Sequence, residues 1–207
     1  MTDELSDVDK AGIDMVKTPE ELMDKDFNHY ACLYIGGGNT YKLLNDLKTS
    51  GAFDKIKKYL LEYNGIVYGG SAGAIIFGKD LDSCNTDDEN EVGLVDNTGF
   101  DMINGYSLLC HYTNRGFEKT ELSRKYLLEL SKTKPVYAIP EEDTIFVDGD
   151  KIEFIGDRSY YEFINGIDNK REIKIRSMKK YVCVMDGIKR NAGGFEYKLD
   201  EINISNN

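Results

Sequence analysis

A serine flanked by glycines is the residue of this sequence best suited to nucleophilic chemistry. Ser71 lies within Gly69–Gly73 (GGSAG), after the apolar run Ile66–Tyr68 and before the helix-forming stretch Ala74–Phe77. Between a strand and a helix, this spacing is typical of a nucleophile elbow. The glycines permit a sharp turn, and the helix directs free N–H groups toward the serine oxygen. The pattern predicts a nucleophile, although a plain strand-to-helix turn explains these five residues equally well.

A nucleophilic serine needs a base, because its hydroxyl is barely ionised at neutral pH. The chain holds only two histidines, His29 and His111. His111 follows the apolar run Ser107–Cys110, and parallel sheets place ligand-facing residues where their strands end. His29 precedes a strand-like run and is expected to be an ordinary surface side chain. We therefore predict that His111 is the general base for Ser71.

A carboxylate should complete the set by holding the imidazole in one tautomer. The acidic segment between the serine and the histidine offers several candidates, most of which are expected to be solvated. The residues by themselves do not choose among Asp80, Asp82, Asp87, Asp88, Glu89 and Glu91.

An oxyanion hole needs two N–H donors that point to one place. The residue after the nucleophile, Ala72, would supply one. The other is expected from Gly36–Gly38, which follows the buried-type strand Tyr30–Ile35. This glycine loop lacks the Gly-Lys-Ser/Thr of a P-loop and the spacing of a dinucleotide fingerprint. Cys110, beside the histidine, is an alternative nucleophile, but its place in a strand favours a packed small residue.

The composition excludes several functions. The 207-residue chain has a net charge of −11 and no basic stripe, which argues against nucleic acid as a partner. No apolar run approaches the ~20 residues that cross a bilayer, and the first residues do not resemble a signal peptide. The four cysteines form no C-x-x-C pair, so we expect reduced thiols, a cytoplasmic location, and no metal or cofactor.

Strand-like and helix-like segments alternate along the chain, which predicts an α/β fold. The short spacing between serine and histidine favours a flavodoxin-like, doubly wound, mostly parallel sheet, followed by a C-terminal β-hairpin. The two strands of this hairpin are expected at residues 144–147 and 152–155. We predict a single domain over residues 1–207, with an atypical N-terminus (1–29) and a C-terminal extension (171–207) that is not placed. The other expected elements are helices over residues 18–24, 41–50, 53–63 and 118–130, and strands over residues 135–139, 173–175 and 181–185.

Five motifs follow one another along the chain: Ile35–Thr40, Tyr68–Ala74, Val95–Asp101, His111–Asn114 and Ile139–Glu141. In this order they resemble the peptidase E (dipeptidase E) family of serine peptidases, which is related to cyanophycinase and shares the fold of class I glutamine amidotransferases. The resemblance runs from about residue 33 to residue 163. The family normally begins with an apolar strand and a further strand–helix unit, where this chain has about thirty polar residues.

The resemblance implies a role for each matching position. Ser71 would be the nucleophile and His111 the base, with the N–H groups of Gly38 and Ala72 forming the oxyanion hole. Counting back from the motif at Val95 reaches Glu91 as the acidic member, with Asp88 as the second choice. Asn39 and Arg124 would bind the substrate, and Arg115 is an alternative arginine.

The activity implied is that of a serine exopeptidase that removes the N-terminal residue of dipeptides or short peptides. A small peptide is thus the expected partner, and a homodimer is one assembly to test. The atypical N-terminus supports an alternative, a non-catalytic binding or regulatory protein on the same scaffold. An amidotransferase-type hydrolase is disfavoured because those enzymes use cysteine at the elbow.

Overall fold

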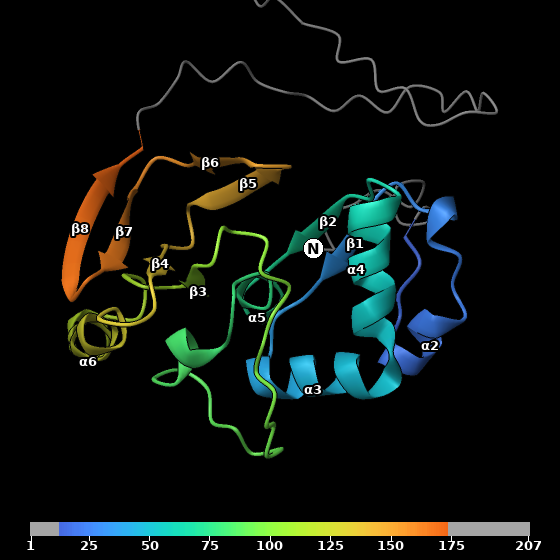
Figure 1. Cartoon of the computed structure of the whole chain (residues 1–207), viewed down its shortest axis with the longest axis horizontal. Helices are drawn as coiled ribbons and strands as arrows, with labels where there is room; N and C mark the ends of the chain where they lie inside the picture. The colour runs from blue at the N-terminus through green and yellow to red at the C-terminus, as the bar shows by residue number, and fades with distance from the viewer. Residues whose placement is uncertain (1–12, 174–207) are drawn as a thin grey trace, which may run out of the picture. The chain divides into compact units, whose positions relative to one another are not determined.

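A computed structural model of the chain describes residues 13–173, which lie in one compact unit that ends at Ile173 (Figure 1). The strand expected at residues 181–185, and all but the first residue of the one expected at 173–175, fall outside the described residues. The prediction of a single domain over residues 1–207 stays a prediction.

The helices are α2 (Pro19–Met23), α3 (Thr40–Ser50), α4 (Ala52–Glu62), α5 (Ala72–Ile75) and α6 (Phe117–Leu130), with short 3-10 turns at Phe27–His29 and Asp82–Cys84. The strands are β1 (Leu33–Ile35), β2 (Val67–Gly69), β3 (Ser107–Leu109), β4 (Val136–Ala138), β5 (Thr144–Asp148), β6 (Lys151–Ile155), β7 (Ser159–Ile164) and β8 (Ile167–Glu172).

The strands form three sheets in the described part of the chain. β1 and β2 are a parallel pair, β3-β4-β7-β8 is a mixed sheet, and β5-β6 is the expected hairpin. The α/β class is therefore confirmed. The mostly parallel sheet is not seen, because two of the described pairings are parallel (β1-β2 and β3-β4) and three are antiparallel. The doubly wound, flavodoxin-like arrangement stays a prediction.

Helix α3 begins and ends where its sequence directs. The Asn39 side chain accepts a hydrogen bond from the Lys42 N–H at 2.9 Å and so caps the first turn. Gly51 ends the helix with φ of 82°, a left-handed conformation that glycine adopts without strain. Helix α4 follows at once and buries Ile56 and Tyr59 in the core. Leu33, Ile35 and Val67 of the β1-β2 pair pack against the same core.

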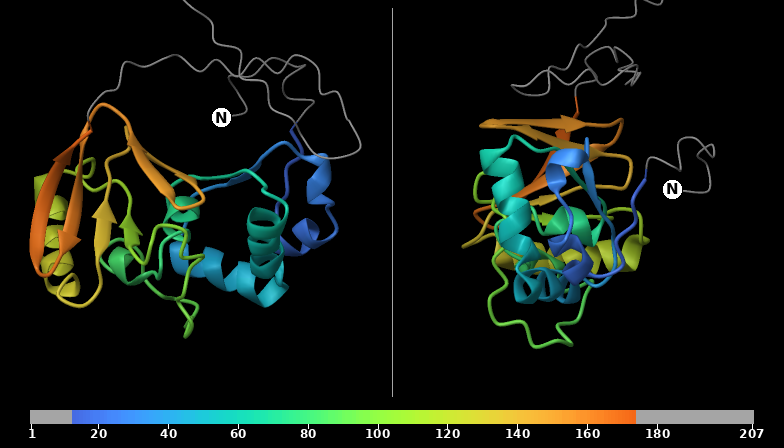
Figure 2. Two further views of the ribbon diagram at one scale, coloured as in Figure 1. Left: turned by 45° about the horizontal axis from the view of Figure 1, so that its top comes forward. Right: turned by 90° about the vertical axis from the view of Figure 1, so that its right-hand side faces the viewer.

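The mixed sheet is covered on both faces. Val136 and Ala138 of β4 are buried on one face, whereas Tyr137 between them points to the other, as alternation along a strand requires. Figures 1 and 2 show α6 along one face and the β5-β6 hairpin near the other. On the hairpin side, Phe154 of β6 lies edge-on to Tyr137 with ring centroids 4.9 Å apart, and it stacks on Tyr160 at 3.6 Å.

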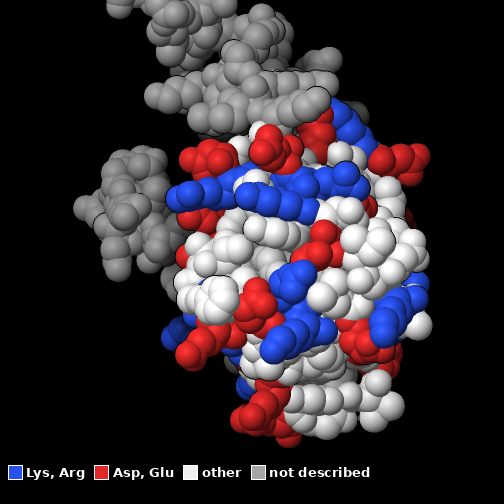
Figure 3. Space-filling model, turned by 90° about the vertical axis from the view of Figure 1, so that its left-hand side faces the viewer, with Lys and Arg blue, Asp and Glu red and all other residues white. Residues whose placement is uncertain are grey.

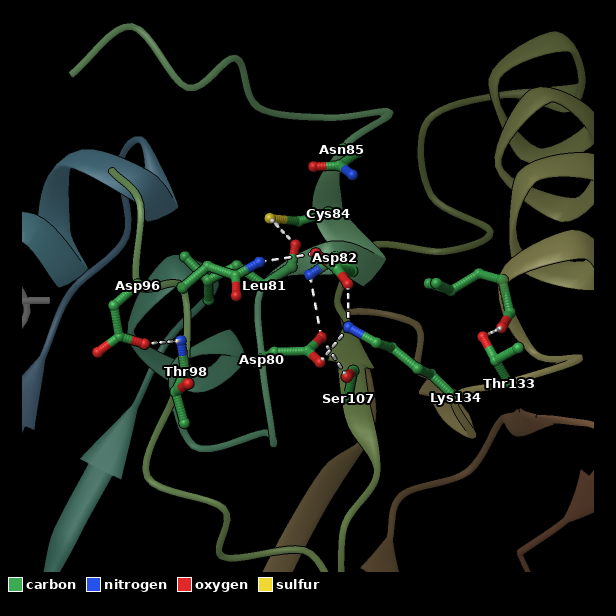
Figure 4. Close-up of polar contacts among 12 residues, drawn as sticks. Asp80, Leu81, Asp82, Cys84, Asn85, Asp96, Thr98, Ser107, Thr133 and Lys134 are labelled. Carbon is green, nitrogen blue, oxygen red and sulfur yellow. Dashed lines mark hydrogen bonds and ion pairs between the residues drawn. The ribbon is translucent and has the colours of Figure 1, made fainter. Parts of the chain in front are cut away.

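A partly buried polar network ties the segment after α5 to the start of β3 and β4 (Figure 4). The Asp80 carboxylate accepts hydrogen bonds from the Ser107 hydroxyl at 2.8 Å and from the Lys134 ammonium at 2.8 Å. Lys134 also contacts the Asp82 carboxylate. Burial acts to lower the pKa of Lys134, but its hydrogen bonds to these two aspartates outweigh that effect and raise the pKa. Two of the acidic residues considered for the active site thus have a structural role.

Replacing Lys134 with alanine is expected to lower the free energy of unfolding by about 1–3 kcal/mol, because it leaves a buried charge without its cation. Only 8% of the Asp80 side chain is exposed. Urea unfolding of the full chain measures the change. Lys132→Ala is the matched control, since the Lys132 side chain, just beyond the end of α6, is 59% exposed and pairs with the exposed side chain of Glu129. Equal stability of the two variants would contradict the prediction.

The surface around β8 and α6 carries charges of both signs (Figure 3). Arg124 of α6 pairs with Asp168 of β8, and Arg171 of β8 pairs with Glu162 of β7. Charged side chains on an outer strand also discourage edge-to-edge pairing with other chains. Within residues 13–173, no helix combines the length and the apolar character that crossing a membrane requires.

Candidate active site

Ser71 occupies a strained turn between β2 and α5. Its φ of 55° and ψ of −117° lie in a region that side chains rarely adopt. Gly70 directly before it donates its N–H to the Ile35 carbonyl at 2.9 Å, which fixes the turn to the end of β1. The glycines are needed for space, since a Cβ at Gly73 would lie 2.0 Å from the same carbonyl oxygen. The local geometry is thus that of a nucleophile elbow.

His111 follows the end of β3 and points its ring at the serine. The Ser71 Oγ lies 2.8 Å from the His111 Nε2, a hydrogen-bonding distance. His111 also has a positive φ, 60°, so that both side chains are presented by unusual backbone conformations. The predicted proximity of these two residues, forty positions apart in the chain, is present in the structure.

Glu141 supplies the carboxylate that contacts the histidine. It follows β4, and its Oε1 lies 2.7 Å from the His111 Nδ1. With this carboxylate accepting from Nδ1–H, the Nε2 is left to accept a proton from Ser71. The Glu141 side chain is 55% exposed and the His111 side chain 22% exposed, so the acid lies at the rim of the site rather than beneath it.

The structure places Glu141, and not the predicted Glu91, beside His111. Glu91 is exposed, and no contact joins it to His111 among the described residues. The segment before it is held at the N-terminus of α3, where the Glu89 carbonyl accepts from the Asn39 amide at 2.9 Å. The second choice, Asp88, accepts the Thr40 N–H at 2.9 Å. A carboxylate at this end of a helix is favoured by the helix dipole, which explains its position.

The glycine loop after β1 lies against the nucleophile, as predicted. A Cβ at Gly37 would lie 3.0 Å from the Ser71 Cβ and 3.4 Å from its Oγ. Among the described residues, no hydrogen bond is found for the N–H of Gly38, which has φ of 139°. The N–H of Ala72 belongs to the first turn of α5, where the helix itself supplies no acceptor. Both predicted donors are therefore available to a ligand.

The two predicted substrate-binding residues are engaged elsewhere. The Asn39 Oδ1 caps α3, and the Asn39 Nδ2 donates a hydrogen bond to the Glu89 carbonyl. Arg124 binds Asp168 across the α6–β8 contact. The alternative, Arg115, pairs with Asp87 at 3.2 Å. The structure brings none of these three side chains into contact with Ser71 or His111.

Cys110 is a packed side chain. It is buried, and its thiol lies 3.8 Å from the Ser71 carbonyl oxygen. Burial raises the pKa of the Cys110 thiol to about 12. Because the thiolate is the reactive form, this residue is not suited to act as a nucleophile. In residues 13–173, no group of three or more His, Cys, Asp or Glu side chains is placed to hold a metal ion.

A serine, a histidine and a carboxylate linked in this order, on an α/β fold with a nucleophile elbow, define the class of serine hydrolases. The sequence model of peptidase family S51 matches residues 4–155. The chain belongs to this family, and the resemblance to peptidase E is confirmed.

Known relatives agree with this assignment. The chain is 32% identical over 122 residues to the uncharacterized peptidase Lmo0363 of Listeria monocytogenes, and 29% identical over 120 residues to the uncharacterized peptidase PM1590 of Pasteurella multocida. The first match covers 58% of each chain, and the second covers 57% of this chain and 56% of its relative. The chain thus spans little more than half the length of these relatives.

Solved structures show the same fold. A crystal structure assigned to a peptidase E protein of L. monocytogenes EGD-e is 28% identical, with a TM-score of 0.54, and the match covers 68% of this chain and 66% of that one. A peptidase from an acI-B1 Actinobacterium, 18% identical with a TM-score of 0.53, supports the fold alone; that match covers 75% of this chain and 61% of that one.

Proposed function

We propose that this chain is a serine exopeptidase that hydrolyses dipeptides or short peptides at the N-terminal residue. The observation that carries the proposal is the unbroken series of contacts from Ser71 Oγ through the His111 ring to Glu141. The proposed triad is therefore Ser71, His111 and Glu141. Membership of peptidase family S51 supports the reaction class, and the restriction to small peptides comes from the family resemblance.

In the proposed reaction, the His111 Nε2 takes the Ser71 proton as the serine oxygen attacks the carbonyl carbon of the first peptide bond. The N–H groups of Gly38 and Ala72 would stabilise the oxyanion that forms. His111 then protonates the departing amine, which breaks the C–N bond and leaves an ester on Ser71. Water, deprotonated by His111, hydrolyses this ester and regenerates the serine. Glu141 holds the imidazole and stabilises its cationic form.

A fluorophosphonate probe tests the proposal on the full chain. Mass spectrometry is expected to locate the label on Ser71, and a panel of dipeptides differing in the N-terminal residue should reveal hydrolysis. Ser71→Ala, with an unchanged circular dichroism spectrum, is the control and is expected to lose both activities. Folded wild-type protein that takes no label and cleaves no dipeptide would instead favour a non-catalytic binding protein on this scaffold.

Replacing Glu141 with glutamine is expected to lower the rate of Ser71 labelling by about 10–100-fold. This is less than the ~10⁴-fold seen when the buried acid of a triad is changed, because Glu141 is half exposed and water screens its charge. Glu91→Gln is the matched control and should label at the wild-type rate. A larger loss in the Glu91 variant than in the Glu141 variant would reverse the assignment.

A further inference from the structure

Asn114 joins the segment that carries the base to the segment that carries the acid. It lies three residues after His111, and its backbone N–H donates to the His111 carbonyl at 3.1 Å, closing a turn. From this turn its side chain reaches the residues that follow β4. The Asn114 Oδ1 accepts the Glu141 N–H at 2.9 Å, and its Nδ2 donates to the Glu142 carboxylate at 3.1 Å.

This double contact matters because little else holds Glu141. Its side chain has several rotatable bonds and is 55% exposed, so packing does not select one rotamer. Among the described residues, the one hydrogen bond made by the Glu141 backbone N–H is that to Asn114. The hydrogen bond from Asn114 also lowers the pKa of Glu142, because it stabilises the ionised carboxylate.

We propose that Asn114 is a positioning residue whose amide fixes the Glu141–Glu142 segment against the histidine turn and so orients Glu141 toward His111. The inference rests on the proposed function. Asn114 touches no reacting atom, and its effect passes through Glu141. A small displacement of a catalytic group lowers the reaction rate by a large factor. A residue that only positions Glu141, as Asn114 does, is therefore expected to have a measurable effect on the rate.

The test measures the second-order rate constant for labelling of Ser71 by a fluorophosphonate probe on the full chain. Asn114→Ala is expected to lower it by about 10-fold. Asn114→Asp should do no better, because its second oxygen would face the Glu142 carboxylate. Adding Glu142→Gln to Asn114→Asp exchanges donor and acceptor, restores both hydrogen bonds and leaves the net charge unchanged. This double variant is expected to recover a rate within about threefold of wild type.

A second comparison separates positioning from a general effect on folding. In a Glu141→Gln background, Asn114→Ala should cost less than about twofold, since the group through which it acts has already been altered. Thr113→Ala, in the same exposed turn, is the matched control and should label at the wild-type rate. Thermal unfolding of each variant accounts for changes in the folded fraction.

Three results would overturn this inference alone. They are a wild-type labelling rate for Asn114→Ala, failure of the donor–acceptor exchange to recover the rate in folded protein, and an equal cost of Asn114→Ala with and without Glu141→Gln. Absence of labelling on folded wild-type protein would instead overturn the proposed function, and the inference with it.

Discussion

Replacing His111 with alanine is expected to lower both dipeptide hydrolysis and Ser71 labelling by about 10³-fold or more, because the loss of one member disables a triad that acts as a unit. The Ser71 hydroxyl lies 2.8 Å from the His111 Nε2, and no other base contacts it among the described residues. Without the imidazole, the serine stays protonated and attacks slowly. Initial rates with the best dipeptide of the panel, together with labelling rates, measure the effect.

The chain offers a matched control for this variant. Its one other histidine, His29, lies at the end of a short 3-10 turn before β1, with 63% of its side chain exposed. His29→Ala should retain the wild-type rate, and both variants should give the wild-type circular dichroism spectrum. A folded His111 variant with more than a tenth of the wild-type activity would contradict the role of this residue as the base.

Most of the site follows from one rule of parallel strands. The glycine loop follows β1, Ser71 follows β2, His111 follows β3 and Glu141 follows β4. Because the carboxyl ends of parallel strands face ligands in such sheets, the serine, the histidine and the glycine loop could be predicted from the apolar runs before them.

The same rule also points to Glu141, the carboxylate proposed here as the acidic member. Glu141 comes two positions after the predicted strand at 135–139, and His111 comes one position after the predicted strand at 107–110. Counting from the Val95 motif led instead to Glu91, on a loop that is attached to the N-terminus of α3. The assignment of Asn39 to substrate binding stays a prediction, because a residue at the start of a helix can serve as its cap as well as bind a ligand.

The outer part of the mixed sheet was missed, although its signal is present. Asn165-Gly166 is the preferred turn of a two-residue hairpin, and both residues have positive φ, 54° and 76°. This turn joins β7 to β8, and β7 pairs antiparallel with β4. Pairing between distant strands depends on packing of the whole sheet, here around the buried Phe163, and local sequence patterns do not report it.

The close approach at the elbow leads to the largest expected change in stability. Gly73 lies in the first turn of α5, and a Cβ there would come 2.0 Å from the carbonyl oxygen of Ile35, at the end of β1. The obstacle is backbone, which cannot swing aside as the tip of a flexible side chain would. Gly73→Ala is therefore expected to lower the free energy of unfolding by about 3 kcal/mol or more, as severe overpacking does.

Helix propensity works in the opposite direction and is too small to compensate, since alanine is favoured over glycine by only about 1 kcal/mol in a helix. Gly36→Ala is the matched control. It lies in the loop after β1, and a Cβ there would meet only the Tyr34 ring at 3.8 Å, an ordinary contact. Urea unfolding should show a large drop for Gly73→Ala and a change within about 1 kcal/mol for Gly36→Ala. Similar urea midpoints for the two variants would show that the turn at Ser71 accommodates a Cβ at position 73 without loss of stability. The close approach of Gly73 to the Ile35 carbonyl would then not explain the strained conformation of Ser71.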